Sequence, residues 1–244
     1  MINDCASTTE KGVYWYMYCL NNPLKYTDPT GQLFVLDDYG LDKLTGKITH
    51  LRDTYDNFDR LIALDEAGKE TNKSIKVYDK NILPELAKRR EGWGKTIYAK
   101  SESSEIGDVF LFAAQNSIVE WGFDGYRNNG RNEYVVYTDR STKGISPSKN
   151  WHMFRDATPL FDIHSHFTTN MDFRKASGYN PGDLGNSDYS TITNSYYSNG
   201  NKVPNSYIYH PYSESLIKYT PWNPQENIKT GVTYPGGLLF LYKK

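Results

Sequence analysis

Hydrophobic and polar positions alternate in short runs along most of the chain, which is the pattern of half-buried β-strands. Upstream of residue 80, charged turns such as 65–69 separate four apolar runs, at 33–36, 48–51, 61–64 and 74–78. We expect these runs to form β-hairpins that pack before the main domain.

A helical period replaces this alternation in three places. Residues 104–117 put Ile106, Val109 and Phe110 on one broad face, with Ser103 or Ser104 available as N-cap. Shorter helices are predicted at 83–90 and at 188 to about 197. Further strands are predicted at 118–123, 133–138, 160–163, 207–210, 216–219 and 238–242. This order predicts an α+β fold, an α/β sandwich with a mixed β-sheet flanked by helices and an N-terminal β-hairpin extension.

Composition narrows the range of partners. Mean hydropathy is -0.70 and 15% of the 244 residues are aromatic, which is typical of a folded, soluble protein. Lys and Arg number 28 against 29 Asp and Glu, so we expect neither nucleic acid nor a membrane as partner. Two cysteines are too few for a cysteine zinc knuckle or a disulfide scaffold. The first residues lack a secretory apolar region, so we expect a larger polypeptide to carry any export.

The strand at 160–163 runs directly into two histidines, His164 and His166. Because side chains alternate along a strand, both imidazoles point to the same side, close enough to bind one metal ion. Such a pair also arises by chance in strands that bind no metal. The pattern nevertheless makes His164 and His166 the candidate ligands for Zn²⁺.

A catalytic zinc needs a third protein ligand, and two aspartates downstream are candidates. Asp183 follows Asn-Pro-Gly, where a turn would also explain it. Asp188 begins the predicted helix at 188–197, where it could equally be a helix cap. The choice between Asp183 and Asp188 stays open.

Zinc hydrolases also use a base that takes a proton from water, usually a Glu that does not bind the metal. Glu120 is an isolated charge inside the apolar run Ser117–Phe123, directly after the predicted helix. Burying such a carboxylate without a partner is costly, whereas an edge strand would let it face solvent. Glu120 is the candidate base.

Together these residues resemble the JAB/JAMM metallopeptidases, which have a Glu on an early strand, then His-x-His, then Ser-x-x-Asp. The matching positions are Glu120 with Gly122 two residues later, then His164 and His166, and then Asp188 or Asp183. The resemblance covers about residues 104–220 and implies zinc-dependent hydrolysis of an amide or isopeptide bond.

The chain departs from the JAB/JAMM pattern at three points, one of which is a longer loop before the Asp. Phe167 stands where a Pro usually follows the second His, and the Ser of Ser-x-x-Asp is missing. Ser187 or Ser177 is expected to replace that Ser, whose role in the family is to stabilise the tetrahedral intermediate. The loss affects catalytic efficiency more than metal binding.

Residues 16–31 resemble the last motif of the core of RHS-repeat proteins, through the string Tyr-x-Tyr-x-x-Asn-Asn-Pro-Leu-x-Tyr-x-Asp-Pro-x-Gly. The resemblance implies a polymorphic toxin: residues 1–31 end the RHS core, 32–100 form a β-rich extension or linker, and 101–244 form the JAB-like toxin domain. It also implies delivery into a target cell as part of a larger exported protein, with an RHS shell and a cognate immunity protein as partners.

The leading hypothesis is therefore a zinc peptidase or isopeptidase toxin that acts on a protein in the target cell. A JAB-fold binding module without catalysis is the alternative from another class, and zinc content would separate the two. A metal-dependent nuclease is a third hypothesis, which the balanced charge disfavours.

Overall fold

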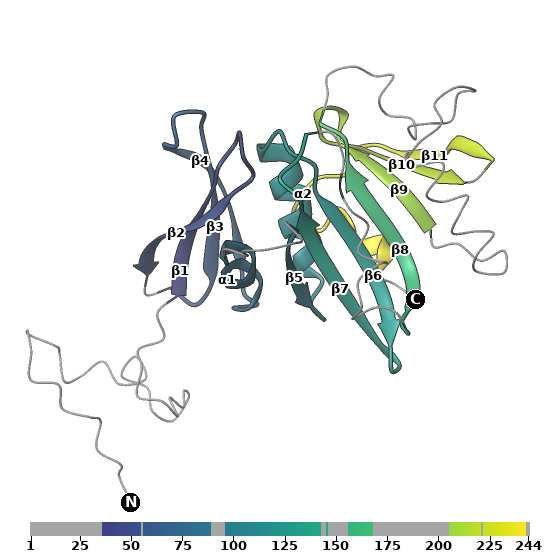
Figure 1. The fold of residues 1–244 in the computed structure, drawn as a ribbon, viewed down its shortest axis with the longest axis horizontal. Helices are drawn as coiled ribbons and strands as arrows, with labels where there is room; N and C mark the ends of the chain where they lie inside the picture. The colour runs from purple at the N-terminus through teal and green to yellow at the C-terminus, as the bar shows by residue number, and fades with distance from the viewer. Residues whose placement is uncertain are drawn as a thin grey trace, which may run out of the picture.

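The computed structural model describes residues 36–54, 56–88, 96–142, 145, 156–167, 205–220 and 222–242. Within them the chain forms two sheets and two α-helices, so the predicted α+β class is confirmed. Figure 1 shows the two sheets on either side of the helices. The RHS-like motif at 16–31 and the predicted helix at 188–197 lie outside the described residues.

The upstream sheet has four strands in the order β2-β1-β3-β4, formed by β1 (Leu36–Leu41), β2 (Ile48–Thr54), β3 (Asp59–Leu64) and β4 (Glu70–Val77). It consists of two antiparallel hairpins joined by the parallel pairing of β1 with β3. The buried carboxylate of Asp38 ties three strands together, because it accepts hydrogen bonds from Arg52 Nε at 2.8 Å and from Arg60 Nε at 2.9 Å. The hairpins predicted for this region are thus one continuous sheet.

The downstream sheet has seven strands in the order β11-β10-β9-β8-β6-β7-β5. Its strands are β5 (Ile97–Ser101), β6 (Gly122–Asn128), β7 (Arg131–Thr138), β8 (Thr158–Ser165), β9 (Asn205–His210), β10 (Ser215–Thr220) and β11 (Asn223–Lys229). The pairing of β8 with β9 is parallel and the other pairings are antiparallel, so the sheet is mixed. The predicted division at residue 100 falls within β5.

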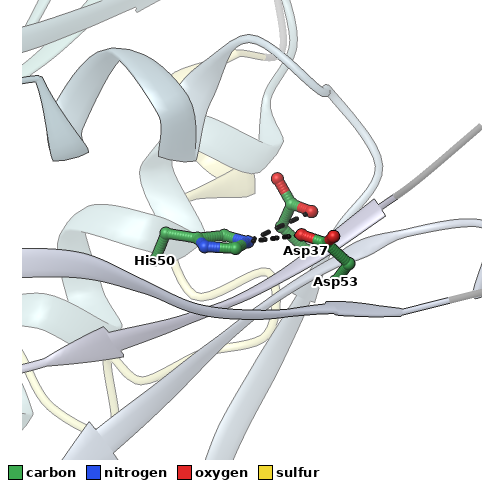
Figure 2. Close-up of side chains that lie close together, drawn as sticks. All are labelled: Asp37, His50 and Asp53. Carbon is green, nitrogen blue, oxygen red and sulfur yellow. Dashed lines mark ion pairs between the residues drawn. The ribbon is translucent and has the colours of Figure 1, made fainter.

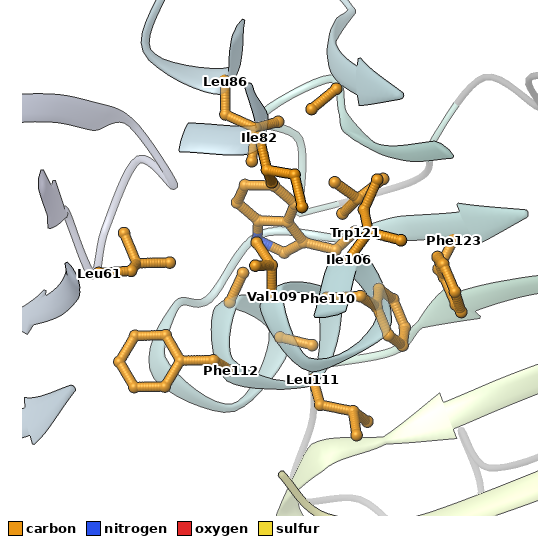
Figure 3. Close-up of a cluster of buried hydrophobic side chains, with 14 of the residues drawn as sticks. Leu61, Ile82, Leu86, Ile106, Val109, Phe110, Leu111, Phe112, Trp121 and Phe123 are labelled. Atoms are coloured by element: carbon orange, nitrogen blue, oxygen red, sulfur yellow. The ribbon is translucent and has the colours of Figure 1, made fainter. Parts of the chain in front are cut away.

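Two helices pack between the sheets: α1 (Ile82–Ala87) and α2 (Glu105–Asn116). Eight of the twelve residues of α2 are buried, including Phe110 and Phe112, because both flanks of the helix face apolar side chains. Figure 3 shows Trp121 lying between α1 and α2 with Leu61 of the upstream sheet nearby. One hydrophobic cluster includes residues of both sheets, so the two sheets share a core.

Two predicted strands differ from the structure. The predicted strand at 118–123 is wrong in its position, because β6 starts only at Gly122. The apolar run at 238–242, predicted as a strand, contains the 3-10 helix η6 (Leu239–Leu241). Another 3-10 helix, η5 (Pro211–Ser213), connects β9 and β10. Strands β5 and β11 were not predicted. None of the described helices has the length and apolarity needed to cross a membrane.

Candidate functional site

His164 and His166 lie together at the carboxyl end of β8, on the seven-stranded sheet. Their Nε2 atoms are 3.0 Å apart and their ring centroids 4.8 Å apart, with both side chains half-buried. Alternation along the strand explains the convergence, since the buried Ser165 between them points to the opposite face. The backbone N–H of His166 donates to the Tyr209 carbonyl at 2.9 Å, which fixes the end of β8 against β9.

The register of the sheet brings Glu120 to the level of His166. Gly122 of β6 is the cross-strand partner of His164, and the Ser165 N–H donates to the Trp121 carbonyl at 2.8 Å. Continuing this antiparallel register places the backbone of Glu120 opposite His166. Trp121 is buried in the core, and the alternation of a strand, if it continued beyond β6, would carry its neighbour Glu120 to the face of the two histidines.

The backbone of Glu120 is held on both sides although it lies outside a strand. Its N–H donates to the Ser141 carbonyl at 2.8 Å, and its carbonyl accepts from Thr138 Oγ1 at 2.7 Å. Glu120 is half-buried and does not lie in a strand, so it is not a charge that faces solvent from an edge strand. Because the backbone of Glu120 is fixed, the side-chain rotamer alone determines where its carboxyl group lies.

Gly122 and two tyrosines shape the surface around the histidine pair. A Cβ on Gly122 would lie 2.1 Å from Cζ of Tyr137, so the absence of a side chain lets this ring cross the strand beside His164. The Tyr137 hydroxyl donates to Asp124 Oδ2 at 3.1 Å, which fixes the ring. On the other side, the ring of the buried Tyr219 lies edge-on to His164, with centroids 6.4 Å apart.

Several predicted site residues lie outside the described residues: Asp183, Asp188, Ser187 and Ser177. The structure thus brings His164 and His166 together and places the Glu120 backbone beside them, while the third ligand and the serine stay predictions. His210, the last residue of the predicted strand at 207–210, is the fully buried last residue of β9, with Nδ1 2.7 Å from Ser213 Oγ.

A further group that could hold a metal ion lies on the four-stranded sheet (Figure 2). His50 Nε2 is 3.4 Å from Asp37 Oδ1 and 3.1 Å from Asp53 Oδ1. Tyr39 donates to the second oxygen of Asp37, and Asp59 accepts the Asp37 N–H. The sequence analysis missed this group because Asp37 and Asp53 meet only through the pairing of β1 with β2.

Burial shifts the pKa of two neighbours of this second group. The buried position of Asp59 raises the pKa of its carboxyl, and the neighbouring Asp37 charge adds to that effect. Burial likewise raises the pKa of the Tyr39 phenol, helped by its hydrogen bond to Asp37. Both shifts follow mainly from burial, and the nearby negative charge of Asp37 adds to them.

The fold and the histidine pair together define an α+β domain with a candidate metal centre at the end of a mixed sheet. Residues 98–193 match the model of the family described as JAB-like toxin 1. This match spans less than half of the chain and supports a JAB-like toxin domain that includes most of β5, together with α2, β6, β7, β8 and both histidines. No curated protein and no solved structure matches the chain.

Proposed function

We propose that the JAB-like toxin domain is a zinc-dependent peptidase or isopeptidase. The observation that carries this proposal is the 3.0 Å approach of the His164 and His166 Nε2 atoms at the end of β8, where Gly122, two residues after Glu120, pairs with His164. The family match supports the toxin character and the JAB-like fold. The peptidase chemistry is inferred from the side chains of His164, His166 and Glu120.

The donor set fits zinc. Two nitrogens that bind one tetrahedral zinc at the usual bond lengths lie about 3.3 Å apart, close to the separation of the two imidazoles. His164 and His166 would hold the ion together with Asp188 or Asp183, as the JAB/JAMM resemblance implies. When bound, zinc supplies a Lewis acid that polarises a carbonyl group and makes water more acidic.

Glu120 is proposed as the general base. Its carboxylate takes a proton from the attacking water and returns it to the leaving amine, so that a single residue serves both halves of amide hydrolysis. The two backbone hydrogen bonds of Glu120, to the Ser141 carbonyl and from Thr138 Oγ1, hold its backbone in place. Ser187 or Ser177 is proposed to stabilise the negative charge that develops on the carbonyl oxygen.

The biological setting is also part of the proposal. The RHS-like motif at 16–31 supports delivery into a target cell as part of a larger exported protein, with the RHS shell as carrier. A zinc peptidase that acts on cellular proteins would harm its producer, so a cognate immunity protein is the expected partner. The substrate is a protein of the target cell.

The test combines metal content with hydrolysis. Wild-type protein, Glu120→Gln and His166→Ala are loaded with zinc, dialysed and incubated with a bacterial lysate, and newly formed α- and ε-amino groups are identified by amine labelling and mass spectrometry. We expect wild type to generate new amines. Glu120→Gln should retain zinc but lose at least about 100-fold in rate, the usual contribution of a general base.

His50→Ala is the matched control, because it removes an imidazole from the other sheet. It should keep both zinc and activity. A wild-type protein that binds no zinc and releases no amines would instead support the non-catalytic binding module. A fully active Glu120→Gln variant would refute the base assignment, and cleavage of plasmid DNA by wild type would favour the nuclease hypothesis.

A further inference from the structure

The turn that connects β1 and β2 in the upstream sheet touches the segment that carries Glu120. The N–H of Ile118 donates to the Lys43 carbonyl at 2.9 Å, which links this segment to a residue outside the JAB-like match. Val119 and Trp121, the two neighbours of Glu120, are each 1% exposed. The backbone of the proposed base is thus built into the contact between the two sheets.

The turn itself is rigid. One oxygen of Asp42 accepts hydrogen bonds from the backbone N–H of Leu44 at 3.1 Å and of Thr45 at 2.7 Å, and from the Thr45 hydroxyl at 2.7 Å. The Asp42 backbone also closes the turn, because its carbonyl accepts from Gly46 N–H and its N–H donates to the Lys47 carbonyl. A turn held in this way cannot yield easily when a neighbour presses on it.

Gly46 is the point of closest approach. A Cβ built on Gly46 would lie 2.3 Å from Cγ2 of Val119 and 3.7 Å from Cζ2 of Trp121. Val119 is β-branched and buried, so its methyl group cannot swing away without a change in rotamer or backbone. The glycine therefore lets the turn sit directly against the residue that precedes Glu120.

Displacement of Val119 would be passed to Glu120. The other side of Trp121 is anchored, because its indole N–H donates to Ser117 Oγ at 2.9 Å and its backbone N–H donates to Ser165 Oγ at 2.9 Å. Because Trp121 is held at these two points, a displacement of Val119 is passed along the backbone to the peptide of Glu120. His164 and His166 lie on a different strand and would keep their positions.

We propose that the four-stranded sheet positions the general base, with Gly46 as a positioning residue for Glu120. Residues 36–88 are then a working part of the hydrolase and not a linker before it. This inference rests on the proposed function, because it assumes that Glu120 is the base. It assigns a role to a part of the chain that lies outside the JAB-like match.

The test compares two glycines that both have positive φ. Gly46 has φ 63° and meets Val119, whereas Gly68 has φ 75° and a Cβ built there would meet no atom within 4 Å. Gly46→Ala and Gly68→Ala therefore carry similar backbone strain and differ in the contact. Val119→Ala and the Gly46→Ala/Val119→Ala double variant complete the set, since removing the two methyl groups of Val119 leaves room for the new one.

Each variant is measured for zinc content, for kcat and KM on a peptide that spans a bond cut by wild type in the lysate, and for the amide chemical shift of Glu120. We expect Gly46→Ala to keep its zinc and its KM within about 2-fold while kcat falls about 10- to 100-fold, the effect of a small misplacement of a catalytic group. The Glu120 amide should shift. Gly68→Ala should match wild type, and the double variant should recover most of the lost kcat.

The inference is overturned if Gly46→Ala keeps the kcat and the Glu120 amide shift of wild type. It is also overturned if Gly46→Ala and Gly68→Ala lose the same activity, or if the double variant recovers none. Wild-type protein that cuts no bond in the lysate would refute the proposed function itself, a separate result from the behaviour of the glycine variants.

Discussion

His164 with His166, and His50 with its two aspartates, lie on different sheets and bring together different ligand atoms. The first group presents two imidazole nitrogens that lie 3.0 Å apart. The second presents one imidazole nitrogen beside carboxylate oxygens of Asp37 and Asp53.

Burial separates the two groups further. The side chain of His50 is 45% exposed and that of Asp53 71%, so water screens their interaction. His164 and His166 are half-buried and flanked by the aromatic rings of Tyr219 and Tyr137. A cluster of residues that could bind a metal is therefore weak evidence for metal binding by itself, because the ion pairs of His50 explain its cluster without any metal.

The largest expected effect distinguishes the groups by metal binding. Wild type should bind about one zinc per chain at the proposed site of two histidines and one aspartate, and His166→Ala should bind almost none, because two remaining ligands hold zinc poorly. His50→Ala should bind as much as wild type. Metal analysis after dialysis measures both. Loss of zinc in His50→Ala with retention in His166→Ala would show that the His50 group binds the zinc and the histidine pair does not.

A second prediction concerns the glycines beside the two groups. Gly122 pairs with His164, and a Cβ there would lie 2.1 Å from the Tyr137 ring. Gly122→Ala should therefore lower the free energy of unfolding by about 2–3 kcal/mol through overpacking. Thermal or urea unfolding measures the loss.

Gly40, which pairs with Thr49 next to His50, is the matched control for Gly122. A Cβ on Gly40 would lie 2.9 Å from Cδ1 of Leu64, the end of a flexible side chain that can turn aside. The cost of Gly40→Ala should stay below about 1 kcal/mol, because the loss of chain entropy in the unfolded state offsets part of the crowding. Equal losses at Gly40 and Gly122 would contradict the idea that the Tyr137 ring is fixed.

A third prediction uses the raised pKa of Asp59. Burial raises the folded-state pKa of this carboxyl above its unfolded value, so its ionised form costs stability at neutral pH, and stability is gained as pH falls through the folded pKa. Asp59→Asn keeps an acceptor for the Asp37 N–H and removes the charge. It should stabilise the protein at pH 7, because the folded chain then no longer has to keep a buried carboxylate ionised.

The advantage of Asp59→Asn should disappear below about pH 4, where the carboxyl is protonated in both the folded and the unfolded chain. Urea unfolding between pH 3 and 7 measures this dependence. Destabilisation at pH 7 would mean that the Asp59 charge is needed where it lies, for example to hold a cation with His50.

Local periodicity was enough to predict α2 and the histidine pair. A strand places residues i and i+2 on one side whatever it pairs with, so the convergence of His164 and His166 follows from the sequence near them. The three-residue spacing of Ile106 and Val109 similarly indicated a buried helix face, and both side chains are fully buried.

The remaining errors came from contacts between distant parts of the chain. The apolar residues Ile118 and Val119 resemble a strand, but the Ile118 N–H is bound by Lys43 and the segment lies between two sheets. The parallel pairing of β1 with β3 has no local signal at all. Strand β11 was missed because an edge strand of mostly polar residues lacks the expected alternation.

The smallest expected effect tests whether the His50 group is only an ion pair. Asp53→Asn removes a 3.1 Å contact with His50, but it also relieves repulsion from Asp37, its cross-strand partner. These opposed changes between exposed groups should alter the free energy of unfolding by no more than about 0.5 kcal/mol, and salt should reduce the difference further. Urea unfolding at low and high salt measures it. A loss above about 2 kcal/mol that zinc restores would show that Asp37, His50 and Asp53 bind a metal. Both groups would then be metal sites, and they would differ only in their affinity for the ion.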